Sequence, residues 1–334
     1  MREEDATDEL QPLDYIFSVD ILNEGIDIVE VNQVIMLRPT QSPIVFIQQL
    51  GRGLRKAEGK EYVVILDFIG NYNNNFMIPV ALSGDNTYNA DVIRKYVISG
   101  NSTIPGASTI HFDEIAKEKI FHAIDCIKPS TLKELMKEGY VNLKNRLGRR
   151  PMLLDFYENA EMDPLVIIKE YKTYYSFAEQ MEKNEQLFRL SEQEKTTLEY
   201  LSKTILSGVR PDELEILRLF LEKNQITYSE VIDSCKERYG YEITTQKIDL
   251  ACDVLKGKFV TNSTEREKFY QIDILEADGE NRLKRILSYT ERLAHKDFYD
   301  QVQDIVAVGL ARYQDKYAKP YRNGVPFVLY EKYS

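Results

Sequence analysis

Short apolar runs alternate with a helical stretch in the first part of the chain. The runs lie at residues 15–19, 34–37 and 62–68, and residues 42–54 between the last two read as a helix. Continuous apolar strands that alternate with helices are typical of a parallel sheet covered on both faces. Three strands are few for such a sheet, since sheets average about 5–6 strands. We therefore expect the chain to begin inside an α/β domain.

The pattern becomes mainly helical after residue 110. Residues 71–110 are rich in Asn, Ser, Thr, Gly and Pro, which predicts connecting loops with one helix at residues 90–97. Further candidate helices span residues 112–126, 130–138, 151–159, 163–181 and 190–206. Asp113 and Ser130 are the expected N-caps of the first two, because their side-chain oxygens can accept from unpaired backbone N–H groups.

Residues 210–275 show an order of elements that is typical of a small DNA-binding module. Helices are predicted at residues 211–223, 227–239 and 244–255, and a strand at residues 268–274. Three helices followed by a short hairpin are the pattern of a winged helix-turn-helix. Small three-helix domains without a role in DNA binding share this pattern, so both interpretations remain open. Two more helices, at residues 282–293 and 296–318, and a strand from residue 324 complete the prediction.

Composition and charge exclude several classes of protein. The 334 residues are 43% hydrophobic and 29% charged, which is the composition of a folded chain. Lys and Arg number 43 against 54 Asp and Glu, a net charge of −11, so nucleic acid is expected to bind only at a local basic patch. No run reaches the roughly 18 apolar residues of a membrane helix, and the acidic N-terminus is not a secretory signal. We expect a cytoplasmic protein without membrane contact.

The cysteines and histidines do not predict a metal site. Cys126, Cys235 and Cys252 are far apart and lack CxxC spacing, and the three histidines are scattered. These spacings suit neither a zinc site nor a disulfide framework. They are compatible with a reducing cytoplasm.

The strongest motif lies at residues 48–55, which read Gln-Gln-Leu-Gly-Arg-Gly-Leu-Arg. Arg52 and Arg55 are three positions apart and share one face of a helix. A guanidinium matches phosphate oxygens, so two of them can neutralise charge on a transferring γ-phosphoryl group. The alternative is an exposed helix end with ordinary surface arginines. A second element in the same α/β unit, Gly25-Ile26-Asp27, argues against that alternative, because its glycine permits a close backbone approach and its aspartate can hold a ribose hydroxyl or orient the arginines.

At these residues the sequence resembles a known family. Residues 18–28, Ser-Val-Asp-Ile-Leu-Asn-Glu-Gly-Ile-Asp-Ile, look like motif V of superfamily 2 DEAD/DEAH-type helicases, and residues 48–55 look like their motif VI. The wider segment from residue 14 to 72 is similar to bacterial helicases of the restriction-subunit-R type, which carry a long helicase-associated C-terminal domain of unknown function. Residues 143–164 and 327–334 resemble that domain less specifically.

The resemblance implies a fold, a reaction and roles for residues. ATP would bind between two RecA-like lobes, with this chain supplying part of the second. Arg55 would be the arginine finger, Arg52 a second phosphate contact, and Gln48 would orient the γ-phosphate or its attacking water. Gly25 and Asp27 would line the nucleotide cleft. Ser18, Val19 and Asp20 would lie near the nucleic-acid backbone or the link between the lobes.

The sequence also departs from the family. The phosphate-binding pattern G-x-x-x-x-G-K-[ST] is absent, since the Gly-Lys pairs at residues 59–60 and 257–258 are followed by Glu61 and Phe259. Asp113-Glu114 is a superficial candidate for the acidic magnesium motif, but it follows motif VI and reads better as a helix start. Without a phosphate cradle and a magnesium ligand, two arginines cannot hydrolyse ATP. We therefore expect ATP and Mg²⁺ to be bound mainly outside this chain, by a first lobe supplied in cis or in trans.

A local basic island lies at residues 142–151. It holds Lys144, Arg146, Arg149 and Arg150 and no acid, so it can contact phosphates. The alternative is a solvated helix end, where cations are favoured. Tyr171, Tyr174 and Tyr175 can stack on unpaired bases; at helical spacing, packing is the simpler interpretation.

The fold class expected is an α/β partial RecA-like lobe followed by a mainly α-helical region. The expected domains are the partial lobe at residues 1–80, a loop and helical region at 81–205, a winged-helix-like module at 206–275 and a helical segment at 276–334. Two hypotheses for function remain. The chain is either the C-terminal segment of an ATP-dependent helicase or translocase acting on nucleic acid, with DNA expected, or a non-catalytic DNA-binding or adaptor protein that retains helicase scaffold.

Overall fold

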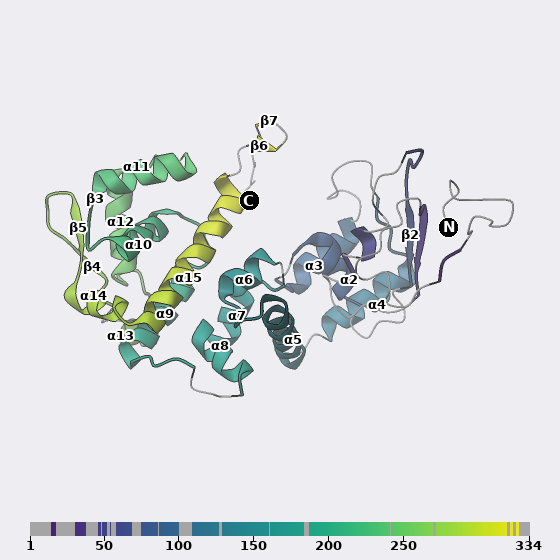
Figure 1. The fold of residues 1–334 in the computed structure, drawn as a ribbon, viewed down its shortest axis with the longest axis horizontal. Helices are drawn as coiled ribbons and strands as arrows, with labels where there is room; N and C mark the ends of the chain where they lie inside the picture. The colour runs from purple at the N-terminus through teal and green to yellow at the C-terminus, as the bar shows by residue number, and fades with distance from the viewer. Residues whose placement is uncertain are drawn as a thin grey trace. The chain divides into compact units, whose positions relative to one another are not determined.

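The computed structural model divides the chain into two compact units, Met1–Glu134 and Leu135–Ser334 (Figure 1). It describes residues 15–17, 31–37, 46–47, 49–51, 54, 58–68, 75–85, 87–99, 109–126, 129–159, 161–183, 187–240, 242–269, 272–318, 321–322 and 325–326. Each unit has its own core and is described by itself.

A parallel pair of strands opens the first unit. Strand β1 (Gln33–Met36) pairs with β2 (Val64–Asp67), with Ile35 opposite Leu66. Residues 46–47 and 49–51 between them are helical. Parallel neighbours need such a crossover connection, so two of the three predicted strands and the helix between them are confirmed. The remaining strand was predicted at residues 15–19. Residues 15–17 of it are described and show no strand pairing, so the prediction is wrong for these residues.

Three helices complete the described part of the first unit. They are α2 (Met77–Ser83), α3 (Ala90–Ser99) and α4 (Glu114–Asp125). The prediction of a loop at residues 77–83 is wrong. Met77 to Val80 are buried, and Pro79 is tolerated because the first N–H groups of a helix have no intrahelical partner. Asp113 caps α4 as predicted, since its Oδ1 accepts from the Ala116 N–H at 2.7 Å.

The second unit begins along α5 (Pro129–Leu147). This helix starts before Ser130, which is therefore not its N-cap, and runs well beyond the predicted end at residue 138. It ends at Gly148, which has a φ of 65° and donates its N–H to the Lys144 carbonyl at 3.0 Å. A left-handed residue of this kind is the usual helix stop, and glycine adopts it at little cost.

The helix predicted at residues 163–181 is two helices. They are α7 (Pro164–Tyr171) and α8 (Tyr174–Met181), preceded by α6 (Leu153–Glu158) and followed by α9 (Glu192–Thr204). Lys172 has a φ of 67°, and Thr173 then accepts from the Ser176 N–H to start α8. The sequence pattern does not reveal this break, because both helices bury apolar residues at helical spacing.

The next elements form a helical module with a small sheet. Their order is α10 (Asp212–Glu222), β3 (Gln225–Thr227), α11 (Tyr228–Tyr239), α12 (Thr245–Leu255), α13 (Ser263–Phe269), β4 (Leu275–Ala277) and β5 (Arg282–Arg285). The strands are antiparallel in the order β3-β5-β4. The three predicted helices of this module are confirmed. The strand predicted at residues 268–274 is wrong, because α13 extends to Phe269 and β4 begins at Leu275.

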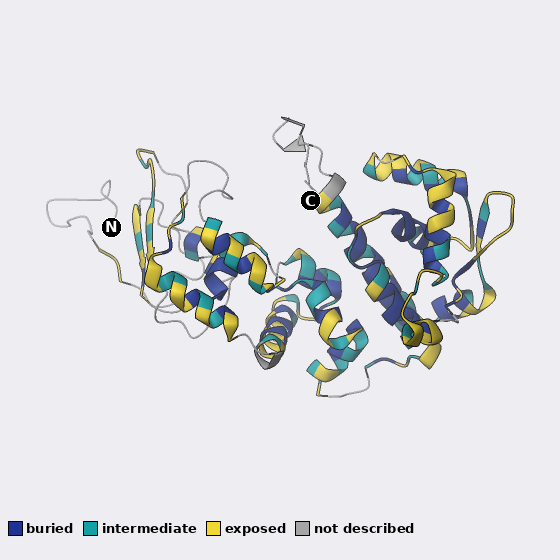
Figure 2. Ribbon diagram, turned by 180° about the vertical axis from the view of Figure 1, so that it is seen from behind, coloured by how far each residue is buried: buried dark blue, intermediate teal, exposed yellow. Residues whose placement is uncertain are grey.

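A long helix forms the centre of the second unit. Helix α15 (Lys296–Tyr313) packs against α6, α9, α10 and α14 (Leu287–Leu293), and Figure 2 shows it largely buried. It continues as a π-helical turn, η5 (Gln314–Ala318), before two-residue strands β6 (Tyr321–Arg322) and β7 (Val325–Pro326). The helix predicted at residues 282–293 starts only at Leu287, because β5 takes the first four positions. No described helix is long and apolar enough to cross a membrane.

Candidate nucleotide and nucleic-acid interface

The predicted nucleotide-site residues lie outside the residues that the structure describes. This applies to the motif VI residues Gln48, Arg52 and Arg55, and equally to Gly25, Asp27, Ser18, Val19 and Asp20. Their roles stay predictions.

The described residues around motif VI show how its helix is anchored. Phe46 and Leu50, four positions apart, are 3% and 8% exposed, whereas Leu54 is 58% exposed. The Leu54 N–H donates to the Leu50 carbonyl at 3.1 Å. Residues four apart share a helix face, so this segment buries one side in the first unit and leaves its end accessible.

The basic island is largely paired within the second unit. The Lys144 Nζ lies 2.5 Å from the Glu182 Oε1, and both Arg149 Nη atoms donate to the Asp155 carboxylate at 2.7 Å. These contacts affect ionisation: the hydrogen bond from Lys144 lowers the pKa of Glu182, and the hydrogen bond to Asp155 raises the pKa of Arg149. The first pair joins α5 to the end of α8, and the second fastens the turn between α5 and α6.

The two remaining cations of the island, Arg150 and Arg146, have different surroundings. The Arg150 guanidinium lies 4.6 Å from the centre of the Phe188 ring, a cation–π contact. Arg146 is exposed, and its charge acts to lower the pKa of Glu161, although burial raises that pKa overall. The structure therefore brings three of the four predicted cations into internal contacts, although the side chains of Lys144 and Arg149 stay 44% and 55% exposed, and Arg146 is exposed as well.

Two of the three predicted tyrosines, Tyr171 of α7 and Tyr174 of α8, make packing contacts inside the unit, whereas Tyr175 is half-buried. Tyr174 is buried, donates its hydroxyl to the Pro151 carbonyl and has its ring 6.3 Å from Phe188. The Tyr171 ring lies 5.2 Å from Phe177. These contacts favour packing over base stacking at both positions.

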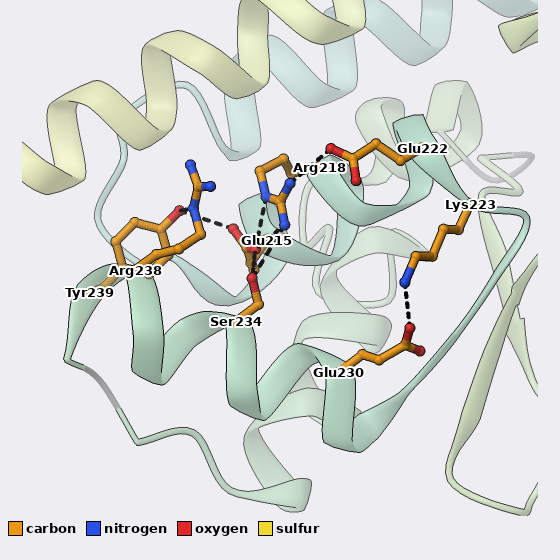
Figure 3. A network of polar contacts seen from close by, with 8 residues as sticks. All are labelled: Glu215, Arg218, Glu222, Lys223, Glu230, Ser234, Arg238 and Tyr239. Carbon is orange, nitrogen blue, oxygen red and sulfur yellow. Dashed lines mark hydrogen bonds and ion pairs between the residues drawn. The ribbon is translucent and has the colours of Figure 1, made fainter.

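A buried carboxylate joins α10 to α11 (Figure 3). Glu215 is fully buried and accepts hydrogen bonds from Arg218 at 2.8 Å, from the Tyr239 hydroxyl at 2.9 Å and from the Ser234 hydroxyl. Burial alone would raise the pKa of Glu215, but the hydrogen bonds from Arg218 and Ser234 bring it below its usual value. Sequence reasoning missed this site, because Glu215 lies in an acidic helix start where exposed carboxylates are ordinary.

The buried cysteines of this module are not reactive thiols. Burial, with a contribution from Glu215, raises the pKa of Cys235 to about 12, and burial likewise raises the pKa of Cys252 to about 12. Both thiols stay protonated at neutral pH and lack the thiolate needed for nucleophilic or metal chemistry. Within the described residues no group of three His, Cys, Asp or Glu side chains could hold a metal ion.

The outer face of α12 and the β4–β5 turn are acidic. Asp249 accepts from the Tyr228 hydroxyl at 2.6 Å, and Asp253 lies 2.7 Å from Lys258. In the turn, Asp278 and Glu280 both bind Arg282. Residues 212–285 carry 12 Lys and Arg against 16 Asp and Glu, a net charge of −4. This module does not present a broad positive surface.

Two protein-family models match the chain, and each match lies within one of the two compact units. Residues 136–317 match the model of a domain of unknown function, DUF8090, and residues 3–57 match the helicase conserved C-terminal domain. The first match lies inside the second compact unit, and the second lies inside the first.

One curated protein is similar to a short part of the chain. The yeast protein named "Putative ATP-dependent helicase IRC3", from Saccharomyces cerevisiae, is 42% identical over 50 residues. That alignment covers 15% of this chain and 7% of the yeast protein, so the chain spans only a small part of the length of this relative.

Proposed function

Because the chain belongs to the family defined by the domain of unknown function DUF8090 and has a helicase conserved C-terminal domain ahead of it, we propose that it is the C-terminal part of an ATP-dependent helicase acting on DNA. The observation that carries this proposal is that the helicase match, residues 3–57, contains the arginine motif at residues 48–55. The parallel pair of β1 and β2 supports it, since a RecA-like lobe is built from such crossovers. Within this proposal, the parent is a superfamily 2 enzyme of the restriction-subunit-R type.

In this proposal motif VI supplies the groups that act on ATP. Arg55 is the arginine finger, Arg52 a second phosphate contact, and Gln48 orients the γ-phosphate or the attacking water.

ATP and Mg²⁺ are held mainly by a first lobe that this chain does not contain. The chain has no phosphate-binding loop, so it supplies only the second side of the cleft. Gly25 and Asp27 line the cleft on this side, and Ser18, Val19 and Asp20 lie near the nucleic-acid backbone. We expect this chain alone not to turn over ATP.

The test of the proposal is the Arg55→Ala variant of a helicase that joins this chain to its first lobe. Loss of an arginine finger lowers kcat for ATP hydrolysis by about 10³–10⁵-fold. The control is Arg94→Ala on α3, a half-buried arginine that pairs with Asp91 and Asp125. Normal turnover in Arg55→Ala, measured by phosphate release, would remove the arginine-finger assignment.

The helical module at residues 212–285 has the order of elements of a winged helix and, within this proposal, contacts nucleic acid through a local surface. The order helix, strand, two helices and a terminal hairpin, with the first strand beside the last, is the arrangement expected of such a module. The extra helix α13 before the hairpin departs from it.

A non-catalytic DNA-binding or adaptor role is the second candidate function. The absent phosphate-binding loop favours it. It predicts salt-dependent DNA binding by the chain alone that weakens on neutralising the island cations. Arg146→Gln is the cleanest probe, because Lys144, Arg149 and Arg150 also make internal contacts. Unchanged binding in Arg146→Gln would count against the island.

A further inference from the structure

An ordered turn after α12 presents an exposed aromatic ring. The Gly257 N–H donates to the Val254 carbonyl at 2.9 Å and the Lys258 N–H donates to the Asp253 carbonyl at 3.1 Å. Gly257 has a φ of 72°, which allows the chain to reverse at the helix end. These hydrogen bonds order the backbone next to Phe259. The Phe259 side chain is nevertheless 57% exposed.

Three basic residues lie close to Phe259 in the sequence. Lys256 and Lys258 precede Phe259, and Arg266 lies beside the turn because its Nε donates to the Val260 carbonyl at 3.1 Å. Lys258 contacts Asp253 at 2.7 Å, and its side chain is still 57% exposed. The single acid among residues 256–266, Glu265, is engaged by Lys203 at 2.8 Å. Residues 256–266, here called the Phe259 turn, are therefore locally positive in an acidic module.

The chemistry of this turn suits an unpaired nucleic-acid strand. Every base has a π face that can stack on an exposed aromatic ring, and neighbouring cations can contact the phosphates on either side. Reading a duplex with α12 and the hairpin is disfavoured, because Asp249 on α12 and Asp278 and Glu280 in the β4–β5 turn would repel its phosphates. The Phe259 turn differs from both surfaces in its charge.

We propose that the Phe259 turn binds single-stranded nucleic acid, with the Phe259 ring stacked on a base and Lys256, Lys258 and Arg266 on the flanking phosphates. The choice of nucleic acid as the ligand rests on the function proposed above. The position of the contact rests on the turn's own geometry and charge.

The first experiment measures stacking. Binding of the full chain to a fluorescein-labelled oligothymidylate is followed by fluorescence anisotropy. Phe259→Ala should weaken binding about 5- to 150-fold, the range expected for loss of one base–aromatic stack. Phe259→Trp should retain binding, whereas Phe259→Leu should not, because leucine keeps apolar surface but has no ring. The matched control is Leu287→Ala, another strongly exposed apolar side chain, which should leave binding unchanged.

The second experiment measures phosphate contacts. The triple variant Lys256→Gln, Lys258→Gln, Arg266→Gln should reduce the slope of log K against log salt concentration by about 2, since each phosphate contact on a single strand contributes about 0.7. Lys236→Gln on α11 is the control, because Lys236 is exposed and contacts only Glu242 among the ion pairs described. Its slope should equal that of the wild type.

The outcomes separate this inference from the helicase assignment. Equal affinity of wild type and Phe259→Ala would overturn the turn as the binding site. Failure of the wild-type chain to bind the oligonucleotide, or binding to anionic lipid vesicles instead, would overturn it too. Neither result bears on motif VI, which the ATP turnover of Arg55→Ala tests independently. Circular dichroism of each variant confirms that the fold is intact.

Discussion

Two buried carboxylates hold helices together at the scale of single residues. Asp304 of α15 accepts from the Leu153 N–H at 2.8 Å and the Leu154 N–H at 3.1 Å. These are the first residues of α6, whose own N-cap, Met152, makes no side-chain cap bond. A residue distant in sequence therefore supplies the cap that the local sequence lacks.

Asp304 predicts a pH dependence of stability. Burial raises its pKa to about 7, above the usual 3.8, so the folded state holds a proton that the unfolded state has released. The stabilisation is fully present below about pH 4 and is lost as the pH rises to about 7, up to about 4 kcal/mol in the free energy of unfolding. Asp304→Asn should remove this slope in urea titrations at several pH values, and exposed Asp233→Asn should keep it. A wild-type stability that is flat between pH 4 and 7 would contradict the prediction.

Glu215 predicts a large loss of stability at one residue. Glu215→Gln leaves Arg218 without its buried carboxylate, and breaking a buried pair costs about 3–5 kcal/mol. Glu222→Gln is a matched control, because Glu222 contacts the same Arg218 at 3.0 Å from an exposed position. That change should cost under about 1 kcal/mol. Urea unfolding measures both, and equal costs would show that the network in Figure 3 is not structural.

At the scale of elements, a close crossing positions α15. Gly309 of α15 faces α10 and the end of α9: a Cβ added there would lie 2.5 Å from the Leu214 Cδ2 and 2.9 Å from the Ile205 carbonyl oxygen. Gly208 has a φ of 63°, and a Cβ there would lie 2.3 Å from the Gly309 carbonyl oxygen. A Cβ at either position would clash with these atoms, so both positions require glycine.

Gly309→Ala should destabilise the second unit. Forcing a methyl group against backbone and a packed leucine costs about 1–3 kcal/mol. The control is Gly139→Ala in α5, where the added Cβ meets only the flexible Glu161 side chain at 3.0 Å. That variant gains helix propensity and should change the melting temperature much less. A melting temperature of Gly309→Ala equal to that of wild type would disprove the close crossing.

At the scale of the whole molecule, the chain is two compact units. The DUF8090 match begins at residue 136 and the second unit at Leu135, so the family domain and the compact unit coincide at this end. The second unit has its own core along α15, which includes Phe298, Val302 and Val308. Such a core is the mark of an independently folding domain.

We therefore expect residues 135–334 to fold alone. Expressed without the first unit, they should unfold cooperatively at the temperature of one transition of the full chain, measured by calorimetry. A non-cooperative transition would show that the first unit is needed for folding of the second.

Features that depend on a local pattern could be predicted from the amino-acid sequence. It located β1 and β2, the Asp113 cap and the helices of the 212–255 segment, because strand runs, capping oxygens and 3.6-residue periodicity are encoded within a few residues. The motif at residues 48–55 was also readable, since its chemistry needs particular residue types at fixed spacing.

Features that depend on distant partners became visible in the folded chain alone. The break at Lys172, the strand β5 in a predicted helix and the pairing of Lys144 with Glu182 and of Arg149 with Asp155 follow from what each segment packs against. The cap that Asp304 supplies to α6 joins residues about 150 positions apart. A local pattern carries no information on such partners, because burial and pairing are set by the whole fold.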